Sequence, residues 1–157
     1  MKLWLKIFLC VFAINLVGGL GAIFTVSEIG GWYAKLEKPP GVPPNWIFGP
    51  VWTLLYTMLG VAIALVWHRA EPGEEKKRAV IWFFLQMVLN VKWTPVFFTL
   101  HWLGVALGII VVLLIAIIFT IRQFRRVDKT AAMLLIPYLV WVCYATYLNA
   151  GYWWLNG

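Results

Sequence analysis

The chain has 157 residues, of which 63% are hydrophobic and only 12% are charged, and its mean hydropathy is +0.86. Soluble domains are about 45–50% apolar and about 25% charged, so this composition excludes a soluble enzyme, a disordered tail and a disulfide scaffold. A formal charge of +7 would suggest a nucleic-acid partner in a soluble protein. In a chain this apolar we expect no nucleic-acid partner, and the basic residues are first tested as signals of orientation in a membrane.

Five stretches are long and apolar enough to cross a bilayer, which takes roughly 20 consecutive apolar residues. They cover residues 7–26, 46–67, 79–100, 102–121 and 131–154. The connections between them are short, and the alternating pattern of a membrane β-barrel is absent. We therefore predict an all-α integral membrane protein, a five-transmembrane-helix bundle that forms a single domain over residues 1–157. At the N-terminus, the apolar run continues to residue 26, which favours a span over a cleaved signal peptide.

Lysine and arginine are distributed unevenly between the two ends of this bundle. With five spans, one end holds the N-terminus and the second and fourth loops, and it carries ten of these residues: Lys2, Lys6, Arg69, Lys76, Lys77, Arg78, Arg122, Arg125, Arg126 and Lys129. The other end carries two, Lys35 and Lys38, both in the first loop. The positive-inside rule then predicts a cytoplasmic N-terminus and an external C-terminus.

The first loop, residues 27–45, differs in composition from the other connections. It contains the adjacent aromatic residues Trp32 and Tyr33, followed by prolines at positions 39, 40, 43 and 44. Prolines stiffen a loop by fixing φ, which suits a structured lid over the helices. Aromatic residues next to a span are also typical of anchors at the level of the lipid headgroups. The composition leaves both interpretations open.

The predicted spans carry aromatic and amide groups rather than buried carboxylates. None of the six acidic residues falls within a span, which argues against a proton relay or a cation filter. His68 and His101 have no Cys, Asp or Glu at metal-ligand spacing, so no metal site is predicted. Three stripes follow helical spacing: Gln86, Asn90, Trp93 and Phe97; Trp52, Tyr56 and Gly60; and Pro137, Trp141, Tyr144 or Ala145, and Leu148. Packing between helices is enough to explain each stripe by itself. Amide side chains in a bilayer, however, turn toward other helices. The stripes could therefore also line an aromatic site, which suits a flat, apolar ligand.

A further set of residues follows a distinctive order along the chain. It consists of Trp32, Tyr33, Leu36, Lys38, Pro39, Pro43, Pro44 and Trp46, then the runs 49–53 (GPVWT), 89–98 (LNVKWTPVFF), 137–141 (PYLVW) and 145–149 (ATYLN). In these motifs the chain resembles the TspO/MBR family of tryptophan-rich sensory proteins and translocator proteins, also called peripheral benzodiazepine receptors. The resemblance covers nearly the whole chain. It implies a five-helix bundle, often dimeric, whose first loop folds over a pocket for protoporphyrin IX and other flat lipophilic ligands. It also suggests a bacterial member in the plasma membrane.

The matching motifs imply which side chains form this pocket. They are Ala22, Tyr33, Pro43, Phe48, Gly49, Trp52, Asn90, Trp93, Trp141, Ala145 and Leu148. The helical stripes add Tyr56 and Gln86. The chain departs from animal members at their sterol motif in the fifth span, because no Lys or Arg follows Lys129. Sterol binding is therefore doubtful, whereas the porphyrin interpretation is unaffected.

Three functions remain open from the sequence. The first is binding of porphyrins for tetrapyrrole sensing, sequestration or transport, with the porphyrin as a ligand and no cofactor required. The second, which has been proposed for family members, is light-dependent porphyrin degradation with Trp52 and Trp141 as catalytic residues and no conventional enzyme chemistry. The third is facilitative transport of another lipophilic substrate. The expected partners are such a small molecule, membrane lipid and a second copy of the chain in a homodimer.

Overall fold

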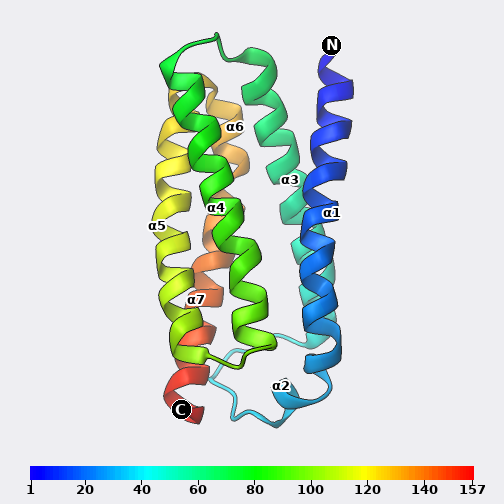
Figure 1. Ribbon diagram of the computed structural model, residues 1–157, viewed down its shortest axis with the longest axis vertical. Helices are drawn as coiled ribbons and strands as arrows, with labels where there is room; N and C mark the ends of the chain where they lie inside the picture. Colours follow the sequence, from blue (N-terminus) through cyan, green and yellow to red (C-terminus); the bar gives the residue numbers. More distant parts are fainter.

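A computed structural model describes all residues, 1–157. The helices are α1 (Leu3–Ile29), α2 (Trp32–Lys35), the 3-10 helix η1 (Asn45–Ile47), α3 (Phe48–Arg69), α4 (Glu74–Phe98), α5 (Leu103–Val127), α6 (Lys129–Leu134) and α7 (Ile136–Asn156). Figure 1 shows the long helices packed side by side as an antiparallel bundle. Five helical segments are long and apolar enough to cross a membrane, with η1 continuing into α3 and α6 into α7. This architecture confirms the predicted all-α, five-helix fold.

The two ends of the bundle differ in what they carry. The N-terminus and the α3–α4 and α5–α6 connections lie at one end, here called the basic end (Figure 1). The C-terminus, α2 and the α4–α5 connection lie at the other, here called the loop end (Figure 1). At the basic end the helices continue past the predicted apolar stretches, since α4 begins at Glu74 and α5 reaches Val127. These extra turns are charged, and charged residues with long side chains are good helix formers. Hydropathy therefore locates the apolar band but not the ends of the helices.

The fifth span is broken near the basic end. Asp128 caps the start of α6, where its Oδ1 accepts hydrogen bonds from the backbone N–H groups of Thr130 (2.8 Å) and Ala131 (3.3 Å). Leu135 separates α6 from α7, and a proline occupies the first turn of α7. Proline has no N–H to continue the ladder of the preceding turn, which explains the break. Asp128 also pairs with Arg69 at 3.1 Å, which joins the end of α3 to the start of α6.

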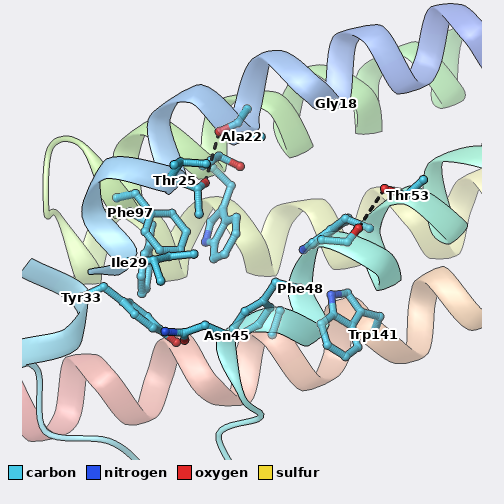
Figure 2. Close-up of a pocket in the computed structure, with 18 of the residues that line it drawn as sticks. Gly18, Ala22, Thr25, Ile29, Tyr33, Asn45, Phe48, Thr53, Phe97 and Trp141 are labelled. Carbon is cyan, nitrogen blue, oxygen red and sulfur yellow. Dashed lines mark hydrogen bonds between the residues drawn. The ribbon is translucent and has the colours of Figure 1, made fainter. Parts of the chain in front are cut away.

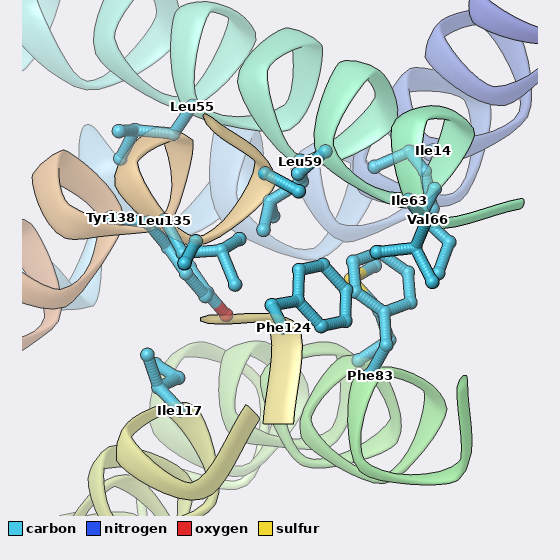
Figure 3. Packing of buried hydrophobic residues seen from close by; sticks show 14 of the residues in the cluster. Ile14, Leu55, Leu59, Ile63, Val66, Phe83, Ile117, Phe124, Leu135 and Tyr138 are labelled. Carbon is cyan, nitrogen blue, oxygen red and sulfur yellow. The ribbon is translucent and has the colours of Figure 1, made fainter. Parts of the chain in front are cut away.

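The half of the bundle near the basic end is solidly packed. Leu59, Phe83, Phe124 and Leu135 are fully buried there, and the rings of Phe83 and Phe124 stack with centroids 5.9 Å apart (Figure 3). In a bilayer such contacts stabilise the bundle through van der Waals packing. Helix α1 contributes only Ile14 to the buried residues. Most of α1 therefore lies on the outer surface of the bundle.

Candidate functional site

A cavity of about 310 Å³ lies in the half of the bundle near the loop end. Helices α1, α3, α4 and α7 form its walls, and Tyr33 and Asn45 contribute from the connection between α1 and α3. Figure 2 shows aromatic side chains from several of these elements directed into the same space. No charged side chain lines the cavity. The site is therefore suited to an uncharged, largely apolar group.

Small residues form the wall that α1 contributes. Gly18, Ala22 and Thr25 are spaced by three or four residues and face the cavity. A Cβ atom at Gly18 would overlap the ring of Tyr56, so glycine is what allows α1 to approach α3 this closely. The hydroxyl of Thr25 donates to the carbonyl of Gly21 at 3.2 Å. The wall is consequently flat and offers few free hydrogen-bonding groups.

Aromatic rings form the walls contributed by α3 and α7. The ring of Trp52 stacks on Tyr56, with centroids 5.4 Å apart and an angle of 28° between the planes. It also meets the ring of Trp141 edge-on, at 6.4 Å and 89°. Phe48 contacts the other side of this group, with its ring 6.2 Å from that of Trp141. Edge-on and offset contacts are the favoured geometries for aromatic pairs, so these rings hold one another in place.

The indole N–H groups around the cavity differ in their partners. Trp93 Nε1 on α4 donates to Asn149 Oδ1 at 2.9 Å, and Asn149 Nδ2 donates to the backbone carbonyl of Leu103 at 2.9 Å. These bonds fix the orientation of Trp93. Trp141 Nε1 is buried and has no acceptor within the protein. A buried donor without an acceptor is costly, so this N–H is a candidate for an acceptor supplied by a ligand.

A chain of hydrogen bonds lies beneath the cavity. The hydroxyl of Tyr56 donates to Asn90 Oδ1 at 2.9 Å, and Asn90 Nδ2 donates to the hydroxyl of Tyr138 at 2.8 Å. Tyr138 in turn donates to Gln86 Oε1 at 2.7 Å. Tyr56 lines the cavity, whereas the other three do not. The two amides therefore support the floor of the site through Tyr56.

The first loop is attached to α7. Tyr33 is 3% exposed, and its hydroxyl accepts a hydrogen bond from Tyr152 at 2.8 Å. Burial raises the pKa of the Tyr33 phenol well above its ordinary value. Further along, the Asn156 side chain accepts from the N–H of Glu37 and donates to its carbonyl, both at 2.9 Å. Together these contacts hold the loop over the end of the bundle next to the cavity.

A second attachment joins the loop to the α4–α5 connection. The ring of Trp32 stacks on that of His101 with centroids 3.9 Å apart. His101 Nε2 lies 3.3 Å from Glu28 Oε2 at the end of α1. The backbone of His101 adopts a left-handed φ of 60°. A positive φ is uncommon outside glycine. Trp32 also contacts Phe97, a cavity residue, edge-on at 5.9 Å. We call the three residues Glu28, Trp32 and His101 the latch.

Comparison with known proteins identifies the family. The sequence model of the TspO/MBR family matches residues 10–155. The chain belongs to the TspO/MBR family. It is 40% identical over 145 residues to the tryptophan-rich protein TspO of Chlorobaculum tepidum, with 92% of each chain covered. It is 38% identical over 152 residues to the protein of that name from Archaeoglobus fulgidus, covering 97% of each. It is also 38% identical over 137 residues to the translocator protein of Homo sapiens, covering 85% of this chain and 80% of that protein.

Membership of the TspO/MBR family confirms the resemblance inferred from the motifs. Together with the five candidate spans, it identifies an integral, multi-pass membrane protein. The relatives cover bacterial, archaeal and animal sequences.

Most of the residues expected to form the TspO/MBR pocket come together around this cavity. Those that line it are Ala22, Tyr33, Phe48, Gly49, Trp52, Tyr56, Trp93, Trp141, Ala145 and Leu148. Pro43, Gln86 and Asn90 do not line it. Gln86 and Asn90 lie one layer below, in the hydrogen-bond chain described above. From the proline-rich connection, Asn45 reaches the cavity instead of Pro43. Whether each of these side chains contacts a ligand stays a prediction.

Some lining residues were not expected in the TspO/MBR pocket. They include Asn15, Gly18 and Thr25 on α1, Thr94 on α4 and Asn149 on α7. On α1 a signal was available, because the small and polar residues recur every three or four positions, as on one face of a helix. Helical spacing also indicated Thr94, which follows Asn90 by four residues and precedes Phe97 by three.

Proposed function

We propose that this membrane protein binds protoporphyrin IX or a similar tetrapyrrole in the cavity, for tetrapyrrole sensing, sequestration or transport. The observation that carries the proposal is the convergence of indole rings from three helices, Trp52, Trp93 and Trp141, on an uncharged cavity. Aromatic faces stack on a flat macrocycle. Neutral amide and hydroxyl groups provide the few polar contacts that fix a ligand's orientation.

The size and charge of the cavity add two conditions. Its volume, about 310 Å³, is at the lower end of the range of roughly 300–1,000 Å³ for small-molecule sites. A tetrapyrrole macrocycle needs more room, so its binding requires the first loop or α1 to move outward. Because no cation lines the cavity, the acid groups of a porphyrin would remain at the mouth, in contact with water.

Titration of the purified protein with protoporphyrin IX in detergent, followed by tryptophan fluorescence, tests the proposal. Trp52→Phe and Trp141→Phe retain most of the stacking, so each should weaken binding by about tenfold or less. Trp154→Phe is the matched control, because Trp154 is 84% exposed and lies outside the cavity. Equal changes in all three variants, or no saturable binding, would refute binding in this cavity.

A second candidate function is light-dependent degradation of the bound porphyrin. It is favoured by the contact between the rings of Trp52 and Trp141, 6.4 Å apart on one side of the cavity, because indoles are readily oxidised. The loss of porphyrin absorbance is measured under illumination and in the dark. If the two indoles take part, Trp52→Phe and Trp141→Phe should bind porphyrin but no longer consume it. Equal bleaching in the wild type, both variants and free porphyrin would exclude this activity.

The setting of the protein is part of the proposal. We infer a bacterial plasma membrane from the resemblance to bacterial members of the family, and a cytoplasmic basic end from the asymmetry of lysine and arginine. A homodimer is proposed as well, since Gly108 on α5 has open space where a Cβ would lie and a second helix can approach such a residue closely. Analytical ultracentrifugation of the protein in detergent, with Gly108→Leu as the variant, tests the dimer. A wild type that is monomeric at all concentrations would contradict it.

A further inference from the structure

An aromatic floor lies between α4 and α5 near the basic end, away from the cavity. The rings of Trp82 on α4 and Phe119 on α5 stack with centroids 5.0 Å apart and an angle of 22°. Phe119 is 38% exposed and Trp82 is half-buried, so the pair forms part of the lipid-facing surface. The hydroxyl of Thr120 is shared between the carbonyl of Ala116 on its own helix, at 2.7 Å, and the backbone carbonyl of Trp82 on α4, at 3.1 Å. Thr120 thus connects α5 to α4 at the level of this floor, and Figure 1 shows the two helices side by side.

Two arginines stand above this floor. The guanidinium carbon of Arg122 lies 5.9 Å from the ring centroid of Phe119. Arg78 precedes Trp82 by four residues and therefore lies on the same face of α4, one turn nearer the basic end. Both arginines are exposed. The ion pairs of the protein are formed by other residues, so neither arginine has a carboxylate partner.

The depth of the arginines matches the boundary of the hydrocarbon layer. Helix α5 carries no charged residue between its start at Leu103 and Arg122. The rise between these two residues is about 28 Å at 1.5 Å per residue. The hydrocarbon core of a bilayer is about 30 Å thick. On α4, Arg78 is likewise the last charged residue before the apolar stretch begins at Ala79. Phospholipid phosphates lie at this level, with their acyl chains beside Trp82 and Phe119.

We propose that the surface formed by Arg78, Trp82, Phe119 and Arg122, here called the lipid face, binds one anionic phospholipid. The phosphate lies between Arg78 and Arg122, whose planar guanidinium groups can each donate two hydrogen bonds to it. The first segment of an acyl chain lies against Trp82 and Phe119. Diffuse attraction of a basic surface to the membrane needs only positive charge. This surface also has an aromatic floor and two arginines without carboxylate partners beside it, as a specific lipid site requires. The site does not depend on the proposed porphyrin function, because it shares no residue with the cavity.

Native mass spectrometry of the full-length protein in dodecyl maltoside measures the binding. The protein is titrated separately with dioleoylphosphatidylglycerol and with dioleoylphosphatidylcholine. The wild type should retain the anionic lipid preferentially. A basic residue near an anionic lipid contributes roughly a fivefold factor in affinity, so Arg78→Gln with Arg122→Gln should weaken retention by about thirtyfold.

A second double variant, Lys77→Gln with Lys129→Gln, is the matched control. It removes the same charge from the same end, but Lys77 lies on a different face of α4 and Lys129 begins α6. Its affinity for the anionic lipid should stay within about twofold of the wild type. Far-UV circular dichroism and thermal melting establish that both double variants fold. Equal weakening in the two would overturn the proposal in favour of diffuse charge attraction.

A photoactivatable phosphatidylglycerol locates the lipid directly. Cross-links should be concentrated in peptides that contain Trp82 or Phe119 and should be lost in the arginine double variant. Cross-links spread evenly over all lipid-facing helices would overturn the proposal. Cross-linking of the lipid face to a second copy of the chain would also overturn the proposal, because this surface would then be a protein interface.

Discussion

Replacing Asn90 by alanine removes two hydrogen bonds at once, the one accepted from Tyr56 and the one donated to Tyr138. Asn90 is 3% exposed, so water does not replace them. Hydrogen bonds between membrane helices contribute about 0.6 kcal/mol on average and about 1.7 kcal/mol at most. We therefore expect Asn90→Ala to lower the free energy of unfolding by about 1.2 kcal/mol, with an upper bound of about 3.4 kcal/mol.

Asn90 should affect ligand affinity indirectly, by holding the side chain of Tyr56 in position. Of the four residues in the hydrogen-bond chain, only Tyr56 lines the cavity. Loss of its hydrogen bond to Asn90, of about 0.6 kcal/mol, corresponds to about a threefold loss in affinity for the ligand. Asn90→Ala and Tyr56→Phe should therefore each weaken porphyrin binding by about threefold. The double variant should also lose about threefold rather than the roughly ninefold of independent sites, because both changes remove the same contact.

Two measurements decide between these outcomes. Unfolding in mixtures of dodecyl maltoside and sodium dodecyl sulfate gives the change in stability, and fluorescence titration gives the dissociation constant. Tyr138→Phe is the control, because it removes the hydrogen bonds below Asn90 but keeps the ring that contacts Trp52. It should lower stability while leaving affinity unchanged. A fully additive, roughly ninefold loss in the Asn90→Ala/Tyr56→Phe variant would refute the reasoning. It would mean that Asn90 contacts the ligand directly.

Three further predictions concern orientation and the first loop. Reporters inserted within residues 70–73 and fused after Gly157 should lie on opposite sides of the membrane, and finding both in the cytoplasm would contradict five spans. His101→Ala removes both contacts of the latch and should speed proteolysis within residues 36–44. Glu28→Gln keeps the aromatic stack and should have less effect. Equal rates of proteolysis in the wild type and both variants would exclude a latch. Because burial raises the pKa of Tyr33, its contribution to stability is fully present below pH of about 10, where the unfolded phenol is neutral, and declines above it. The difference in melting temperature between wild type and Tyr33→Phe should narrow above that pH, and a constant difference would argue against the buried phenol as its source.

Hydropathy and helical periodicity predicted much of this molecule. In a bilayer the backbone N–H and C=O groups can be hydrogen-bonded only in helices or closed barrels. Runs of about 20 apolar residues have the length of spanning helices rather than of barrel strands, so five such runs predict the five-helix bundle. Periodicity also identified the inward faces that carry Trp52, Trp93 and Trp141, because residues three or four apart share one side of a helix. The break between α6 and α7 was not anticipated, although a proline at the start of a run is a signal of one.

The depth of each residue and the choice of neighbouring helices required the tertiary structure. Gln86 and Asn90 share a face with Trp93, yet only Trp93 lines the cavity, because the amides lie further from the loop end and are covered by Tyr56 and Tyr138. Periodicity gives the direction of a side chain but not what another helix places in front of it.

The cavity itself also arises between helices. It depends on contacts made by segments far apart in the chain, such as Gly18 against Tyr56 and Tyr33 against Tyr152. By itself the sequence determined which residues must leave water and which helical faces must meet protein, since both follow from local chemistry and local geometry. Where those faces close on one another and where they leave a space is decided only when all the helices pack together, because a cavity is a property of their combined shape.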